Sequence, residues 1–168
     1  MSSSGSTGLL LKRAAVIGFS LLLLAGSASA ASGPFADFPG SWSGAGRIQP
    51  EGKAAERIRC TAKYSSSGAA EVALQLACDS DSYKFDLSGN FQVASNNQVT
   101  GSWTESTRGV GGTATGVSNG SNLLIHVESS AFSGNMTMVT RGGSQSVNID
   151  TYGGGQKVHA SITLQRGH

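Results

Sequence analysis

The sequence has little charge and few aromatic rings: 13% of its 168 residues are Asp, Glu, Lys or Arg, and 7% are Phe, Trp or Tyr. Glycine, in contrast, occurs 24 times. This balance argues against a coiled coil, a helical bundle and a chain kept disordered by charge repulsion. A chain of this length forms one domain or, at most, two small ones.

A hydrophobic run long enough to span a membrane is also lacking. The apolar run from Ala14 to Leu24 has about a dozen residues, whereas a spanning helix needs roughly 20. It follows Lys12-Arg13 and leads to Ala28-Ser29-Ala30, a small-x-small pattern typical of signal peptidase sites. We therefore predict a signal peptide over residues 1–30 and a periplasmic or secreted protein with no membrane association after cleavage. An uncleaved membrane anchor is the alternative.

Clustered positive charge is absent from the rest of the chain. Without Lys12 and Arg13, ten basic residues remain against ten acidic ones. Arg57, Arg59 and Lys63 come closest to a cluster, but their alternate spacing is typical of one solvated strand face. Because nucleic-acid binding relies on clustered cations, we expect no nucleic-acid partner.

Cysteine is scarce, and the two present are Cys60 and Cys78. In an exported protein such a pair is expected to form a disulfide, which would stabilise the fold by about 3 kcal/mol in the chain-entropy model. Two free buried thiols are the alternative. Two cysteines with no adjacent histidine do not make a metal site, and we expect neither a metal nor another cofactor.

After Pro39 apolar residues recur at every second position, as in strands with one buried and one wet face. Short runs typical of turns separate these alternating segments, among them Asn119-Gly120, Gly142-Gly143 and Ser88-Gly89-Asn90. We predict an all-β fold: an antiparallel meander of about eight to ten strands, closed into a small barrel because closure removes the exposed edges. A two-sheet sandwich is the second choice, and a helix over residues 54–59 is the rival to one strand.

The predicted barrel spans residues 40–168 as a single domain. Residues 31–39, with Phe35 and Phe38, are expected to form an extended lead-in that covers the barrel mouth.

Gly40-Ser41-Trp42, at the start of the first predicted strand, resembles the Gly-x-Trp signature of the calycins, the lipocalin- and avidin-like barrels. In lipocalins an arginine near the last strand packs across that tryptophan, and Arg166 occupies a comparable position. The chain lacks the lipocalin helix and the spaced tryptophans of avidins. The whole pattern, including residues 56–60 and 101–105, resembles short exported bacterial proteins of unassigned function, which implies a fold and a location but no activity.

Glu105 and Arg166 share the inward parity of their strands. A buried charge must be paired or reach water, so these two side chains are expected either to pair and plug one end of the barrel or, apart, to line a polar pocket. The pair is the favoured interpretation.

Catalytic motifs are weak. Residues 116–120 match G-x-S-x-G, with Asp150 and His159 following in the order of a hydrolase, but that motif requires a turn into a helix, and Asn119-Gly120 predicts a hairpin. With no cluster of acid, base and nucleophile, we expect a protein that is not an enzyme.

Two functions remain. The first is a barrel that binds a small apolar or amphipathic ligand through inward aromatic side chains, for which the candidates are Trp42, Tyr83, Trp103 and Phe132. The second is a periplasmic inhibitor or protein-interaction module. Small exported barrels that resemble bacterial metalloprotease inhibitors insert an extended N-terminal segment into an enzyme, and residues 31–39 would be that segment here.

Overall fold

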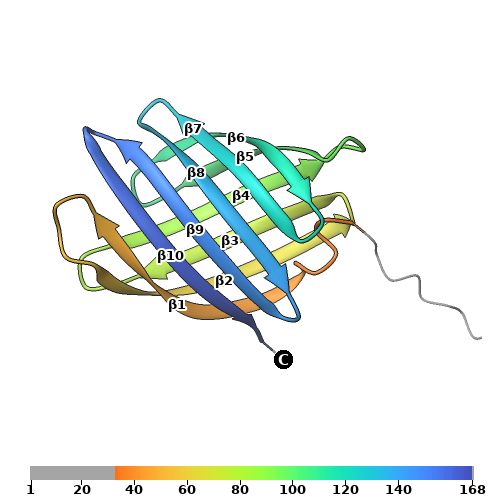
Figure 1. Cartoon of the computed structure of the whole chain (residues 1–168), viewed down its shortest axis with the longest axis horizontal. Helices are drawn as coiled ribbons and strands as arrows, with labels where there is room; N and C mark the ends of the chain where they lie inside the picture. Colours follow the sequence, from red (N-terminus) through yellow and green to blue (C-terminus); the bar gives the residue numbers. More distant parts are fainter. Residues whose placement is uncertain (1–32, 168) are drawn as a thin grey trace, which may run out of the picture.

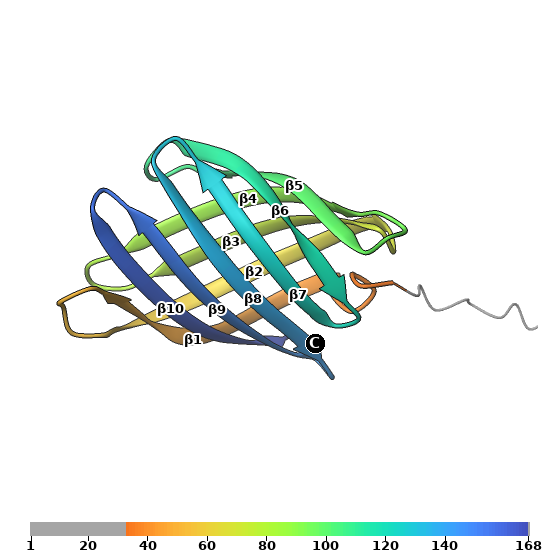
Figure 2. The same ribbon diagram turned by 45° about the horizontal axis from the view of Figure 1, so that its top comes forward.

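The computed structural model describes residues 33–167, so the predicted signal peptide lies outside the described residues. Within that range the chain contains ten antiparallel strands and no helix (Figure 1). Each strand pairs with the next along the chain, and β1 pairs with β10, which closes the barrel (Figure 2). The predicted all-β barrel is confirmed. The strands are β1 Gly40–Pro50, β2 Glu56–Gly68, β3 Glu71–Asp79, β4 Lys84–Val93, β5 Gln98–Glu105, β6 Val110–Asn119, β7 Asn122–Ser129, β8 Phe132–Arg141, β9 Ser144–Gly153 and β10 Gln156–Arg166.

Alternation of side chains explains why these segments form strands. In β2, Ile58 and Tyr64 are buried, whereas Arg57, Arg59 and Lys63 are exposed. A strand points successive side chains to opposite faces, so the apolar file fills the barrel and the charged file meets water. The helix expected as a rival over residues 54–59 does not form, because β2 already begins at Glu56.

Tight hairpins join the strands where the sequence supplies residues that tolerate positive φ. Gly142 and Gly143 connect β8 to β9 with φ angles of 56° and 80°. Positive φ at both central residues is the turn geometry that matches the twist of paired strands. Asn97, with φ of 65°, plays the same part before β5.

One predicted turn is wrong. Ser88-Gly89-Asn90 lies in the middle of β4, and Gly89 is buried, paired with Leu74 of β3 and Trp103 of β5. Serine, glycine and asparagine favour turns locally, but here the pairing of both neighbouring strands continues through them without a break. The two strands predicted on either side of residues 88–90 are therefore one strand, β4.

The two ends of the barrel differ. Residues 33–39 pack at one end, where the turns β2–β3, β4–β5, β6–β7 and β8–β9 and the end of β10 also lie; we call it the plugged end (Figure 1). The opposite end consists of the turns at 51–55, 80–83, 106–109, 130–131 and 154–155, and we call it the mouth.

Aromatic packing closes the plugged end. Phe35 and Phe38 are buried, with ring centroids 5.4 Å apart, and Phe38 lies edge-on to Tyr64 at 5.2 Å. The indole Nε1 of Trp42 donates a hydrogen bond of 2.8 Å to the Phe38 carbonyl. The lead-in is not extended as expected: hydrogen bonds from Ala36 N to Gly33 O and from Phe38 N to Phe35 O curl it into turns. These turns place both rings inside the end of the barrel.

A disulfide joins β2 to β3, as predicted. Cys60 and Cys78 are direct cross-strand partners with Cα atoms 4.1 Å apart, and both are buried on the inward face. The bond therefore ties two neighbouring strands together from inside the barrel.

Candidate ligand-binding site

The four aromatic residues predicted to bind a ligand do not gather in one place. Trp42 lies at the plugged end beneath the Phe38 carbonyl. Tyr83 lies in the turn before β4, near the mouth, where its backbone N–H donates to the Ser80 hydroxyl at 3.0 Å. Only Trp103 and Phe132 touch each other.

The Trp103–Phe132 contact crosses the barrel interior. The two rings come from β5 and β8, which are not neighbours in the sheet, and their centroids are 5.2 Å apart. Trp103 is fixed further by a 3.0 Å hydrogen bond from Nε1 to the carbonyl of Thr113. A Cβ at Gly112 would lie 3.0 Å from the Trp103 ring and 1.7 Å from the carbonyl oxygen of Glu128, so only glycine fits beside this ring. Trp103 is buried and Phe132 is partly exposed, which makes Phe132 the outer ring of the pair.

Inward-facing apolar side chains at the mouth are partly open to solvent. At the plugged end the inward residues Trp42, Tyr64, Leu123 and Leu164 are buried, whereas Phe91 and Val93 of β4 are half-buried. Toward the mouth Ile58, Cys78 and Trp103 are buried, but many of the other inward apolar side chains are only half-buried. We call this group the mouth-lining set: Ile48, Phe85, Val110, Val127, Phe132, Met136 and Ile149.

Glu105 is buried at the mouth end of β5, with 1% of its surface exposed. Its Oε1 accepts hydrogen bonds from the backbone N–H of Asp86 at 3.1 Å and of Thr107 at 2.9 Å, and Oε2 accepts one from the N–H of Arg108 at 3.0 Å. The Thr107 hydroxyl and the Arg108 guanidinium also donate to this carboxylate. Burial opposes ionisation, but these hydrogen bonds prevail and lower the pKa of Glu105 to about 2.

The predicted Glu105–Arg166 pair is wrong. Glu105 pairs with Arg108 at 3.4 Å, in the turn that follows its own strand. Arg166 lies at the plugged end, where its guanidinium stacks 4.8 Å from the centre of the Trp42 ring and donates to the carbonyl of Asp37. Both side chains have inward parity, but they lie at opposite ends of the barrel. The arrangement of Arg166 over Trp42 is the one that the calycin resemblance implied.

A buried polar chain spans the plugged end, and no sequence motif indicated it. The Tyr64 hydroxyl donates to Oε1 of Gln145 at 2.8 Å, and Nε2 of Gln145 donates to the Thr140 hydroxyl at 3.0 Å. Burial raises the pKa of Tyr64, so its hydroxyl keeps the proton that it donates. These bonds link β2 to β8 and β9 across the interior and pair the buried polar groups of Tyr64, Thr140 and Gln145 with one another.

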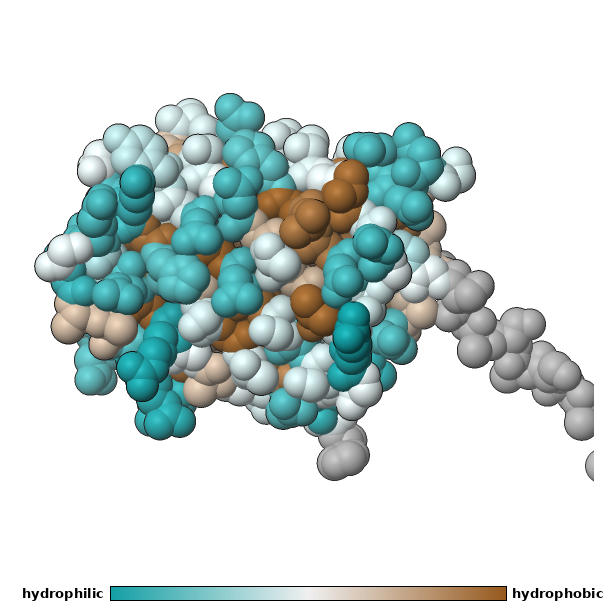
Figure 3. All heavy atoms as spheres, in the orientation of Figure 1, coloured by the Kyte–Doolittle hydropathy of each residue, from teal (hydrophilic) through white to brown (hydrophobic). Residues whose placement is uncertain are grey.

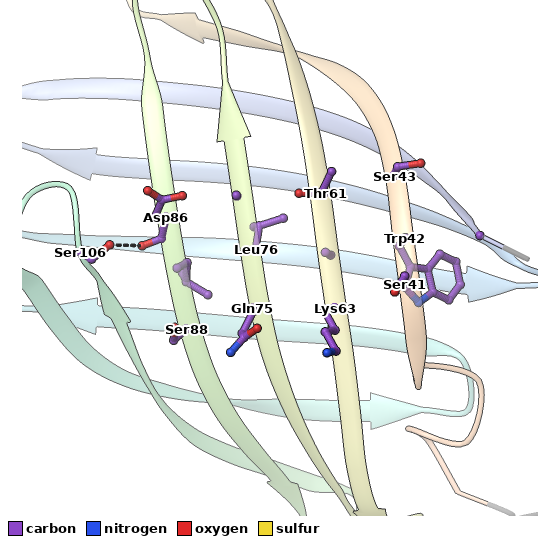
Figure 4. A pocket seen from close by; sticks show the side chains of 14 residues that line it. Ser41, Trp42, Ser43, Thr61, Lys63, Gln75, Leu76, Asp86, Ser88 and Ser106 are labelled. Atoms are coloured by element: carbon purple, nitrogen blue, oxygen red, sulfur yellow. Dashed lines mark hydrogen bonds between the residues drawn. The ribbon is translucent and has the colours of Figure 1, made fainter.

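Two shallow grooves lie on the outside of the barrel. One, of about 540 Å³, crosses β1–β4 between exposed polar side chains; Figure 4 shows Lys63 and Gln75 extending side by side, and Ser106 bonded to Asp86. The other, of about 440 Å³, lies over β7–β10 and includes Tyr152. Hydrophilic residues cover most of that outer face, with smaller hydrophobic areas between them (Figure 3). Neither groove is lined by the mouth-lining set.

The residues of the G-x-S-x-G motif do not form a catalytic arrangement. Ser118 is buried and faces inward in β6, where its hydroxyl bonds to the Gly120 carbonyl. His159 and Asp150 form an exposed pair of 2.8 Å on the outer face of β10 and β9. Across residues 33–167 no group of three or more His, Cys, Asp and Glu side chains is placed to hold a metal ion. The described strands and turns likewise include no helix long and apolar enough to cross a membrane.

Solved structures share this fold at low sequence identity. The S-type phycobiliprotein lyase CPES from Guillardia theta matches with a TM-score of 0.63 and 7% identity, covering 80% of this chain and 90% of its own. Rv2717c from M. tuberculosis matches with a TM-score of 0.64 and 12% identity, covering 80% of this chain and 94% of its own. The fold is thus a calycin-like β-barrel. No protein-family model and no curated protein matches the sequence.

Proposed function

We propose that the protein is a non-enzymatic, exported barrel that binds a small apolar or amphipathic ligand at its mouth. The observation that carries this proposal is that half-buried inward apolar side chains are concentrated toward the mouth, in the mouth-lining set, although Ile58, Cys78 and Trp103 are buried there and Phe91 and Val93 are half-buried near the plugged end. Apolar side chains that remain partly hydrated favour a small apolar ligand, because its binding removes apolar surface from water. The stack of Trp103 and Phe132 would form the floor of the site.

Export is proposed on two grounds. The Cys60–Cys78 disulfide indicates an oxidising compartment. The apolar run at 14–24, followed by a small-x-small site, fits a cleaved signal peptide. A periplasmic or secreted protein meets both conditions.

The alternative, a protein-interaction module that inserts its N-terminal segment into a partner, has less support. Phe35 and Phe38 are buried against the barrel and are therefore not free to enter another protein.

Binding is tested with N-phenyl-naphthylamine, an uncharged probe whose emission rises in apolar surroundings. We expect saturable binding of one probe per chain to the protein that begins after residue 30. Val110 lies in the mouth-lining set, so Val110→Gln places an unpaired amide in the site and should weaken binding about tenfold.

Val117→Gln is the matched control. Val117 lies in the same strand, β6, but is 39% exposed on the outer face, so this change should leave probe affinity unaltered. Absence of saturable binding, or equal weakening by the two substitutions, would contradict the proposed function.

A further inference from the structure

Charge is distributed unequally over the inward faces of the ten strands. Among residues 33–167 the only cation with inward parity is Arg166. It belongs to the plugged end, where Trp42 and the carbonyl of Asp37 hold its guanidinium. The described inward positions at the mouth therefore offer no ammonium or guanidinium group to a ligand.

Two carboxylates take inward positions at the mouth instead. Glu56 begins β2 with the same parity as Ile58, and its Oε1 accepts a 2.9 Å hydrogen bond from the backbone N–H of Ser82. Two hydrogen bonds, one with the Ser80 side chain and one from the backbone N–H of Ser82, lower the pKa of Glu56. The Glu56 carboxylate is therefore charged at neutral pH. Glu105, the second carboxylate, is ionised for the reasons given above.

Cations of the surrounding turns are engaged or face away. Arg108 is paired with Glu105, and Lys84 lies 3.8 Å from the carboxylate of Asp86. Lys157 is exposed on the outward face of β10. Arg47 and Arg57, cross-strand partners at the mouth ends of β1 and β2, are exposed on the outward face. Lys53 is exposed in the turn at 51–55 and projects from a loop rather than from an inward strand position.

We infer that the mouth selects ligands whose polar head is uncharged or cationic and discriminates against carboxylates. The inference rests on the proposed function and narrows its ligand class. A carboxylate at the rim would meet the negative charge of Glu56 without an inward-facing cation of the described strands to offset it, whereas a hydroxyl or an ammonium head would not be repelled. Between two carboxylates a few ångströms apart and partly screened by water, this repulsion corresponds to an affinity about tenfold lower for the carboxylate ligand than for the uncharged one.

The test compares ligands that share one alkyl chain and differ only in the head: dodecanol, dodecyltrimethylammonium and dodecanoic acid, each below its micelle concentration. Each competes against bound N-phenyl-naphthylamine at neutral pH. We expect dodecanol and the ammonium compound to displace the probe at about tenfold lower concentration than the acid. The gap between alcohol and acid should close when the pH is lowered enough to protonate dodecanoic acid.

Glu56→Gln isolates the cause, because glutamine keeps an oxygen for the Ser82 N–H but removes the charge. It should strengthen binding of dodecanoic acid several-fold and leave dodecanol unchanged. Glu128→Gln, on the exposed outer face of β7, and Lys53→Gln are controls expected to change neither.

The outcomes separate this inference from the proposed function. Acid binding as tight as alcohol binding, displacement by none of the three ligands, or no effect of Glu56→Gln overturns the head-group selectivity while probe binding still stands. Failure of the probe itself to bind would overturn the proposed function and the selectivity with it.

Discussion

Glu105 shows how a single buried charge can be held in place by a turn. Its five hydrogen-bond donors come from Asp86, Thr107 and Arg108, and three of these donors are backbone N–H groups. The carboxylate therefore fixes the turn between β5 and β6 and ties it to β4. A neutral side chain at position 105 accepts fewer hydrogen bonds, so some of these part-buried donors would be left without an acceptor.

We predict that Glu105→Gln lowers the free energy of unfolding at neutral pH by about 2 kcal/mol. The folded pKa of about 2 lies below the ordinary value of 4.5, so the stabilisation is present above pH 4.5 and is lost as the pH falls toward 2. Urea unfolding at several pH values measures this. The difference between wild type and variant should shrink steadily across that window.

Glu128→Gln is the control for this experiment, since Glu128 is exposed on the outer face of β7. It should change the free energy of unfolding by less than about 0.5 kcal/mol. A Glu105→Gln variant as stable as wild type, or a difference that does not depend on pH, would show that the carboxylate does not hold the turn.

Parity along a strand predicted which residues face inward but not how far along the barrel they lie. Trp42 and Trp103 share inward parity, yet one lies at the plugged end and the other near the mouth. For the same reason the pairing of Glu105 with Arg166 was wrong. The axial position of a residue depends on the register between all ten strands, and a single sequence does not specify that register.

At the scale of the strand, the disulfide joins β2 and β3, which are already paired through backbone hydrogen bonds. Cys60 pairs directly with Cys78, and the bond closes a segment of 18 residues that contains the β2–β3 hairpin. The bond stabilises the fold mainly by restricting the unfolded chain.

We predict that the double variant Cys60→Ala, Cys78→Ala loses about 3 kcal/mol of unfolding free energy while keeping the barrel fold. Urea unfolding measures the loss, and far-ultraviolet circular dichroism verifies the strands. A reductant should destabilise wild type by a similar amount and leave the double variant unaffected. A loss below about 1 kcal/mol would mean that the bond contributes little.

Strand existence was predictable wherever bulky apolar residues alternate, as in β2 and β10. It was less visible in β6, whose inward file includes Gly112, Ala114 and Gly116 and therefore lacks apolar bulk. In β4 the local preference of Gly89 for turns led to the prediction of two strands, whereas the structure has one continuous strand. In both strands the cause is glycine at inward positions, where close packing inside the barrel overrides local propensity.

For the whole molecule, the sequence predicted closure, the approximate number of strands and a lead-in at one end. It did not predict the asymmetry between the two ends, because that asymmetry arises from contacts between distant segments. Arg166 reaches residues 33–39, and Tyr64 reaches Gln145, only after the barrel has closed. The proposed site is thus a consequence of the complete fold rather than of a motif.

The most direct test of a binding site at the mouth is to map the bound probe onto the barrel. Amide chemical shifts of the isotope-labelled protein, recorded during titration with N-phenyl-naphthylamine, report which backbone groups sense the ligand. We predict that the largest changes occur in the mouth-lining set, at Val110, Val127, Phe132 and Ile149, with little change at Trp42, Tyr64 or Gln145. Changes centred on the plugged end or on either outer groove would contradict the assignment of the mouth as the binding site.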